Sequence, residues 1–452
     1  MKNHSFWLVL GIIAAGIFLR LQVYGDLRLS VAINDTQDYI NSAKVNLLSW
    51  NAFNTYRPYT MNLVYNLFGP DKNYKITAIS GAQQGTSERK IQSGFKVITP
   101  LQIWMSILAW GLFAFSIAST LQKIPFKFIA STLIILFGFT PQIADWDSIL
   151  SSESLSISLF FIFFSLLLIV SQRMIEKRDL DFVTVVLAIV CLLVYFLWAF
   201  SRDSHIYSST VLLLALLVSI FLTRGKKRVI LIALSVFILI FFVVGLLSNS
   251  QRPAININLR HVFNANIIPF GTRVSYFQDR GMPDLDSKEF DPWFEEQSVR
   301  LYAMFLIAHP GYTSQAFFKD LNYAFVENSQ PYFITHELAA RKLLTDLGDN
   351  LHIKSSSVYY QDLFVLISLM TYLIWRRDFN ALIRCGLFAV LFLIANIVLF
   401  MNIFGDTYAL HRHTLFAVTS LRLLQWVLLL TSLDLLFHKL DTEEPIQSPD
   451  PE

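Results

Sequence analysis

The sequence predicts an all-α polytopic membrane protein. Of its 452 residues, 54% are hydrophobic and only 15% are charged, whereas soluble domains average about 25% charged residues. Apolar stretches long enough to cross a bilayer recur along the chain, since a spanning helix needs about 20 mostly apolar residues. The net charge of +3 is too small to indicate nucleic-acid binding.

We expect about ten transmembrane helices from the apolar stretches. The first stretch resembles a signal peptide, but it continues to about Val23 and many spans follow, so we interpret it as a retained helix. Polar residues interrupt 141–153, and such a break is tolerated only where it lines a cavity or reaches an interface. The predicted spans are 5–23, 98–119, 127–143, 150–171, 182–200, 206–223, 228–248, 358–375, 381–401 and 414–437.

Basic residues in the short connections predict the orientation, because they accumulate on the cytoplasmic side of a membrane. The alternate short connections hold only Arg202 and Arg412. Both termini are therefore expected in the cytoplasm. The basic residues of the cytoplasmic set are Lys123, Lys127, Arg173, Lys177, Arg178, Arg224, Lys226, Lys227, Arg228, Arg376, Arg377 and Arg384.

Two long segments, 24–97 and 249–357, then fall on the outer face. In the first, apolar residues at helical spacing from Thr36 to Trp50 predict an amphipathic helix that lies in the membrane interface. The second contains amphipathic stretches at Phe294–Ile307 and His336–Leu347.

We divide the chain into four regions on this basis. They are an N-terminal module of seven spans (1–248), an extracytoplasmic region (249–357), three C-terminal spans (358–440) and a tail (441–452). The tail is acidic and contains proline, so we expect it to be disordered. Cys191 and Cys385 lie in or beside apolar runs, far apart in sequence, and are expected to serve packing.

Ionisable residues gather in the outer connections, at the level where the chain leaves the bilayer. An acid at that depth is costly to place and indicates a function. Acids dominate the first two connections, and bases and histidines dominate the later ones. The candidates are Asp35, Asp38 and Arg57, then Asp145, Asp147 and Glu153, then Arg202, then Arg260 and His261, and finally Asp406, Arg412 and His413.

Each candidate alone also has a structural interpretation. Asp35 could cap the helix that follows it, and Glu153 could favour a helix N-terminus through the dipole. Arg202 and Asp203 could form a local ion pair, and the histidines beside Arg412 could anchor it at the interface.

The combination of residues indicates chemistry on a lipid-linked substrate. Carboxylates can act as a general base or hold a divalent cation such as Mg²⁺ or Mn²⁺. Arginine and histidine can hold a phosphate or diphosphate leaving group. An enzyme that moves a sugar from a lipid phosphate needs both kinds of group at the same depth.

Three motifs resemble the GT-C superfamily, polytopic glycosyltransferases that use polyprenyl-phosphate sugars and include the protein O-mannosyltransferases and aminoarabinose transferases. Asp35-Thr36-Gln37-Asp38-Tyr39 resembles their Asp-x-x-x-Tyr first outer loop, although Thr36 stands where these families often have Glu. Leu150–Leu155 is similar to a Ser/Thr-Glu-Ser-Leu run that opens a later helix. Gly405-Asp406 with Arg412-His413 resembles a run before the last helix, whereas 249–357 matches nothing in these families.

The resemblance implies an inverting transfer with Asp35 as the base that activates the acceptor. Glu153, with Asp145 or Asp147, would assist the acceptor or a metal. The lipid phosphate would be held by a basic group consisting of Arg202, Arg260, His261, Arg412 and His413. Asp38, Arg57 and Asp406 are expected to line the same substrate site.

The leading hypothesis is therefore a glycosyltransferase of a bacterial inner membrane, whose active site faces the periplasm or exterior. The donor would be a polyprenyl-phosphate sugar and the acceptor a lipid, glycan or protein. A lipid-linked glycan flippase is an alternative, but it would carry charges at mid-membrane, and the centres of these helices have almost none. A surface-polysaccharide polymerase or ligase is another, although such enzymes rely mainly on Arg and His.

Overall fold

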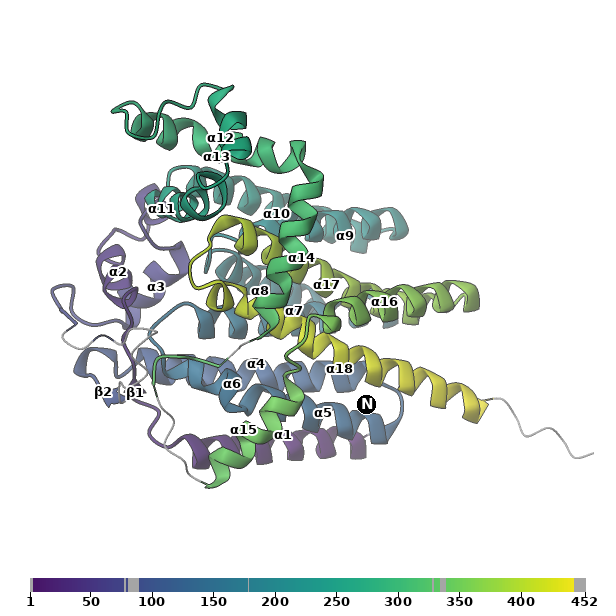
Figure 1. The fold of residues 1–452 in the computed structure, drawn as a ribbon. Helices are drawn as coiled ribbons and strands as arrows, with labels where there is room; N and C mark the ends of the chain where they lie inside the picture. The colour runs from purple at the N-terminus through teal and green to yellow at the C-terminus, as the bar shows by residue number, and fades with distance from the viewer. Residues whose placement is uncertain are drawn as a thin grey trace, which may run out of the picture.

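The computed structural model describes residues 3–76, 79, 89–177, 179–326, 329–333 and 339–442. Helices dominate this part of the chain, and the two short strands β1 (Leu29–Ser30) and β2 (Lys90–Ile91) pair antiparallel. Most of the helices run side by side along one axis (Figure 1). The predicted class, an all-α polytopic membrane protein, is confirmed.

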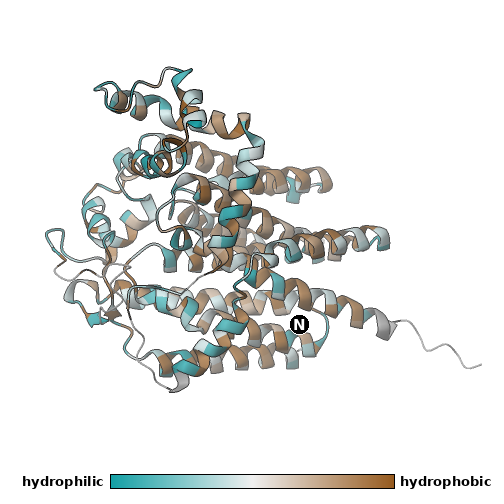
Figure 2. Cartoon of the chain, viewed as in Figure 1, coloured by the Kyte–Doolittle hydropathy of each residue, from teal (hydrophilic) through white to brown (hydrophobic). Residues whose placement is uncertain are grey.

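Nine helices in the described residues are long and apolar enough to cross a membrane. Their side chains are predominantly hydrophobic along most of their length (Figure 2). They are α1 (Asn3–Tyr24), α4 (Ile98–Thr120), α7 (Glu153–Glu176), α8 (Phe182–Ala199), α9 (Ser208–Leu222) together with the turn η4 (His205–Tyr207) before it, α10 (Lys226–Ser250), α16 (Ser357–Arg376), α17 (Phe379–Gly405) and α18 (Leu410–Thr442).

The third predicted span, 127–143, is broken. Helix α5 (Ile124–Phe139) is followed by α6 (Pro141–Ala144) and the 3-10 turn η3 (Asp145–Ser148), and the two parts are bent by 49°. Pro141 cannot donate to the preceding turn, and the residue before a proline is pushed into extended backbone. Thr140 has that conformation, with ψ 153°. The polar interruption predicted from 141 onward is therefore a real break.

The two ends of the bundle differ. Figure 1 shows the N-terminus and the end of α18 at one end, here called the terminal end, and α2, α3, β1 and β2 at the other, here called the site end. Both described termini thus lie on the same side of the bundle. Of the predicted tail, residues 443–452 lie outside the described residues.

The centre of the bundle is α7, which packs against α4 and α8. In its most apolar stretch 83% of the residues are buried, against 17% in α10, which leaves α10 to face lipid. Close packing in the centre requires Gly138 of α5, because an added Cβ would lie 2.1 Å from the fully buried Trp110 ring of α4. Cys191 and Cys385 are also buried, as packing residues should be.

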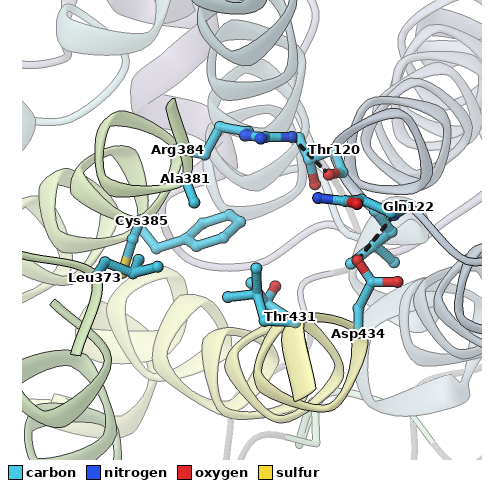
Figure 3. Close-up of a pocket in the computed structure, with 11 residues that line it drawn as sticks. Thr120, Gln122, Leu373, Ala381, Arg384, Cys385, Thr431 and Asp434 are labelled. Carbon is cyan, nitrogen blue, oxygen red and sulfur yellow. Dashed lines mark hydrogen bonds between the residues drawn. The ribbon is translucent and has the colours of Figure 1, made fainter. Parts of the chain in front are cut away.

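A pocket at the terminal end lies where α4, α16, α17 and α18 meet (Figure 3). Its polar residues hold the α4–α5 turn. Asp434 accepts hydrogen bonds from the backbone N–H groups of Gln122 and Lys123, both at 2.8 Å. Arg384 Nη1 donates to the Thr120 carbonyl at 3.1 Å. These contacts join the ends of helices and lie far from the sequence-predicted residues.

The first connection at the site end contains α2 (Thr36–Ser42), η1 (Trp50–Ala52), α3 (Tyr59–Phe68) and η2 (Ser93–Phe95). The predicted helix from Thr36 to Trp50 is wrong in length, since α2 ends at Ser42. Just past its end, Asn66 Nδ2 donates to the carbonyl of the C-cap residue Ala43 at 2.8 Å. Further on Asn46 forms a turn, since its side chain accepts from Leu48 N at 3.0 Å and its carbonyl accepts from Ser49 Oγ at 2.7 Å. Such local bonds compete with a helix.

The long connection is helical as well. It contains α11 (Pro253–Val262), the π-helical turn η5 (Phe263–Ile267), α12 (Gly271–Gln278), α13 (Phe290–Ala308), α14 (Pro310–Val326) and α15 (Ala339–Leu351). Helix α13 confirms the predicted stretch at Phe294–Ile307, and α15 confirms the second from residue 339 onward. The preceding residues, 336–338, lie outside the described residues. Helices α14 and α15 run across the direction of the spans (Figure 1).

Gly138→Ala should lower the free energy of unfolding by about 1–3 kcal/mol, the usual effect of overpacking a filled core. The matched control is Gly11→Ala in α1, where an added Cβ meets nothing within 4 Å. Thermal unfolding of the two purified variants in detergent checks this. Equal melting temperatures would show that α4 and α5 are not packed as described.

Candidate functional site

Nine of the sequence-predicted residues form one connected set at the site end, here called the Asp35 network. They come from the first connection, the start of α7, the short connection 200–207 that ends in η4 (His205–Tyr207), α11, and the start of α18. The members are Asp35, Asp38, Arg57, Glu153, Arg202, His261, Asp406, Arg412 and His413.

Asp35 lies between two arginines. It precedes α2, but its side chain makes no capping hydrogen bond, so the capping interpretation does not describe it. Instead Oδ1 accepts from Arg57 Nη2 at 2.8 Å and Oδ2 accepts from Arg412 Nη2 at 2.7 Å. Burial alone raises the pKa of Asp35, but the charges of Arg412 and Arg57 outweigh burial and hold that pKa well below its usual value.

Arg57 connects Asp35 with Asp38. Its Nη2 donates to Asp38 Oδ2 at 2.9 Å, and its guanidinium lies over the rings of Tyr39 and Tyr56, at 4.8 and 5.0 Å from their centroids. The aromatic faces favour the cation and limit its motion. Arg57 is thereby held in place by two acids and two rings.

Glu153 occupies the first turn of α7 and is only 2% exposed. Its Oε1 lies 3.3 Å from Arg202 Nη1 and 3.4 Å from Arg412 Nε. Its Oε2 is buried and has no hydrogen-bond partner among the described residues. A buried acceptor without a donor is uncommon and calls for an explanation; this oxygen keeps its capacity to accept a hydrogen bond.

Arg412 is the centre of the network, because it contacts both Asp35 and Glu153. It stands in the first turn of α18, and Ala409 just before that helix has φ 50°. A residue with a Cβ is disfavoured in this left-handed region and persists there only where the surroundings demand it. The turn at Ala409 directs the start of α18, and with it Arg412, toward the acids.

The hydrogen bond of Arg202 fixes the proton of His413. Arg202 Nη2 lies 2.8 Å from His413 Nδ1, and since arginine only donates, Nδ1 accepts and Nε2 carries the proton. Nε2 lies 3.7 Å from Asp406 Oδ2, and His261 Nδ1 lies 3.1 Å from Asp406 Oδ1. Burial raises the pKa of Asp406 despite the Tyr408 N–H and His261. This branch ends at the surface with His261.

Sequence reasoning missed Tyr332, which lies in the segment between α14 and α15. Its hydroxyl accepts from Arg412 Nη1 at 3.4 Å. The side chain of Gln330 holds this segment, accepting from the N–H groups of Tyr332 and Phe333 and donating to the Phe333 carbonyl. No periodicity or motif marks these residues, because the turn is specified by one glutamine side chain.

Three predicted residues have other partners. Asp145 binds Arg341 of α15, and Asp147 binds Arg20 of α1, and all four side chains are buried. Arg260 forms an exposed ion pair with Asp291. These three residues are not part of the network, because each forms an ion pair with another residue instead.

The interpretation of Arg202 and Asp203 as a local ion pair is wrong. Arg202 contacts Glu153 and His413, whereas Asp203 pairs with the buried Arg252 at the start of α11. Arg252 also donates to the Phe53 carbonyl at 2.9 Å and to Ser248 Oγ at 2.9 Å. It thus joins the connection that carries Arg202 to the first connection and to α10.

The donor set of the network suits an anion better than a divalent cation. No group of three His, Cys, Asp or Glu residues in the described ranges could hold a metal ion, and both Asp35 and Glu153 contact guanidinium groups. Arginine forks bind carboxylate and phosphate in two-point geometry. Whether the predicted Mg²⁺ or Mn²⁺ takes part stays a prediction, and no step below uses it.

No protein-family model matches the sequence, and no curated protein matches it. Among solved structures, the chain is similar to an archaeal oligosaccharyltransferase, AglB from Archaeoglobus fulgidus, in complex with an inhibitory peptide and a dolichol-phosphate. The TM-score is 0.42 and the sequence identity 12%; the match covers 99% of this chain and 53% of the other. The chain therefore spans about half the length of that protein.

Asp147→Asn should destabilise the protein by about 3–5 kcal/mol, because it leaves Arg20 buried without a counter-charge. Asp38→Asn should cost less than about 1 kcal/mol, because the Asp38 side chain is 42% exposed and exposed ion pairs contribute little. Chemical or thermal unfolding in detergent compares the two. Equal stability of both variants would contradict the burial of the Arg20–Asp147 pair.

Proposed function

We propose that this multi-pass membrane protein is a glycosyltransferase of GT-C type. It would move a sugar from a polyprenyl-phosphate donor to a hydroxyl or amine acceptor, with inversion at the sugar carbon. The single observation that supports this most is the Asp35 network, which gathers acids and arginines from four separate segments at one end of the membrane helices. A lipid-linked donor presents its phosphate at that level.

In this proposal the arginines bind the donor phosphate. Arg412 and Arg57 are held by acids and rings on one side, and their remaining N–H groups can bind phosphate oxygens. Charge-assisted bonds of this kind are about twice as strong as neutral ones. When the bond between the sugar carbon and the phosphate oxygen breaks, the oxygen keeps the electron pair, and the guanidinium groups stabilise that charge.

Asp35 would be the base that takes the proton from the acceptor. The acceptor oxygen or nitrogen then forms its bond to the sugar carbon from the face opposite the phosphate. In the free enzyme Asp35 is a weak base, because Arg412 and Arg57 keep its pKa well below the usual value. Once the donor phosphate shares those guanidinium groups, their charge is partly neutralised and the pKa of Asp35 rises. Donor binding thus activates the base.

Glu153 would hold the acceptor. Its Oε1 is occupied by arginine contacts, and its buried Oε2 has no donor among the described residues. An acceptor hydroxyl that donates to Oε2 would satisfy this oxygen. The acceptor would then be oriented before Asp35 removes its proton.

We further propose that the site end faces the periplasm or exterior of a bacterial inner membrane. The opposite end of the bundle carries the basic residues at the end of α7 and the start of α10, where Lys227 donates to the Lys177 carbonyl. Basic residues in short connections favour the cytoplasmic side, which supports this orientation.

Asp35→Asn should abolish transfer, by about a hundredfold or more, the range expected for loss of a general base. Asp26→Asn is the matched control, since Asp26 is an exposed acid of the same connection that pairs only with Arg28. Transfer of a labelled sugar from polyprenyl phosphate, by protein reconstituted in vesicles, measures both. Wild-type transfer by Asp35→Asn would refute the assignment of the base.

The pH dependence should separate the free enzyme from its donor complex. Asp35 must be charged to act, so activity falls as the pH drops through its pKa. The acid limb of kcat/KM, which reports the free enzyme, should lie below the ordinary pKa of Asp near 3.9, because Arg412 and Arg57 depress it. The acid limb of kcat should lie at higher pH. Initial rates measured across a pH series test this. If the acid limbs of kcat/KM and kcat fell at the same pH, the proposal that the donor phosphate takes the arginines from Asp35 would be contradicted.

A further inference from the structure

A second group of charged residues lies beside the Asp35 network. It comprises Arg20 near the end of α1, Arg89 just before β2, Asp145 and Asp147 of η3, and Arg341 of α15, and is here called the Arg89 cluster. Two ion pairs, Arg20–Asp147 and Arg341–Asp145, use both acids. In the described part of the chain Arg89 forms no ion pair of its own, although the charge of Asp145 acts on it, and the cluster keeps one positive charge in excess.

The backbone places Arg89 at a defined position. The adjacent Lys90 pairs with Ser30 in the β1–β2 ladder, and Val31 N donates to the Ser148 carbonyl at 2.8 Å. Arg89 Nη1 donates to Ser148 Oγ at 3.3 Å, and its guanidinium lies 5.3 Å from the Phe333 ring centroid. The guanidinium is therefore held in place without an acid.

The buried arginines of the cluster keep unused donors. Arg20 and Arg341 are 2% and 3% exposed, and both lie over the Tyr24 ring, at 4.9 and 4.8 Å from its centroid. Arg20 Nε and Nη1 and Arg341 Nε have no hydrogen-bond partner among the described residues. Buried donors without acceptors cost free energy, and an anion placed among the three arginines would supply both acceptors and charge.

The position of the cluster indicates a lipid. Helix α1 ends at Tyr24 and exposes large apolar side chains such as Trp7 and Phe18 along its length, so an acyl chain can lie beside it while the headgroup reaches its end. Neighbouring residues connect the two charged groups, since Tyr332 contacts Arg412 and Phe333 contacts Arg89.

We propose that the Arg89 cluster binds the phosphate of an anionic lipid headgroup. Arginine forks suit the oxygens of a phosphate, and Arg20 places the cluster near the end of α1, whose apolar side chains are exposed. This binding does not depend on the proposed function. Only its role rests on that function: a second lipid held here would be the acceptor, placed beside the donor in the Asp35 network.

Arg89 is the residue to substitute, because the two buried acids of the cluster keep their ion pairs with Arg20 and Arg341 when Arg89 is replaced. Full-length protein without donor is placed in phosphatidylcholine nanodiscs, and binding of fluorescent phosphatidic acid is compared with that of equally labelled phosphatidylcholine. Wild-type protein should prefer phosphatidic acid, and Arg89→Gln should weaken its binding about tenfold, the effect of losing one charge-assisted contact of about 1.4 kcal/mol. Arg89→Lys should retain part of the preference.

The matched control is Arg28→Gln, an exposed arginine at the same end of α1 that pairs with Asp26, and it should bind like the wild type. Wild-type preference in Arg89→Gln, or no preference in the wild type, would overturn the proposal. Displacement by millimolar inorganic phosphate would reassign the site to free phosphate. Since no sugar is transferred in this measurement, its outcome is separate from that of the Asp35 variants.

Discussion

The contact of Arg412 with both Asp35 and Glu153 is the interaction on which the arrangement of the site end depends. It joins the residue before α2 in the first connection with the first turns of the spans α7 and α18, which are far apart in sequence. Each of the two acids also contacts a second arginine, Arg57 or Arg202. Taking an acid out of water is costly unless it is paired, so the three segments stabilise one another in this position.

The same pairing sets a limit on the chemistry that we propose. A carboxylate between two guanidinium groups is stable as an anion and reluctant to accept a proton, which suits a resting enzyme. An anionic donor changes that balance, because it competes with Asp35 for the arginines. In the proposed mechanism the site would hold its base inactive until the donor is bound, and water would be less able to react in place of the acceptor.

The sequence predicted the spans well, because their length and apolar character follow from the bilayer itself. The polar residues from 141 onward predicted an interruption, although the predicted span 127–143 ran past Pro141, where proline interrupts the helix for local steric reasons. The length of α2 could not be predicted, because the Ala43 carbonyl binds Asn66 from α3 and the side chain of Asn46 forms a turn where helical spacing predicted more helix. The predicted topology placed Asp35, Glu153 and Arg412 at the same level of the membrane. The structure adds that Arg412 contacts both acids.

The partners supplied by the long connection were out of reach of sequence reasoning. Arg341 lies 196 residues from its partner Asp145, and Tyr332 lies 80 residues from its partner Arg412. Nothing in the sequence pattern of 249–357 marks either residue. For the same reason Asp145 and Asp147 looked like members of the substrate site. Their burial against Arg341 and Arg20 depends on tertiary packing of α15 and α1.

The most direct test of the account is an experimental structure of the protein with a polyprenyl phosphate bound. The account predicts the phosphate within about 3 Å of Arg412, the range of a direct hydrogen bond, with the Asp35–Arg412 contact opened and Asp35 facing the acceptor side. A phosphate bound elsewhere, with Asp35 still paired to both Arg57 and Arg412, would contradict the exchange of partners and the proposed role of Asp35.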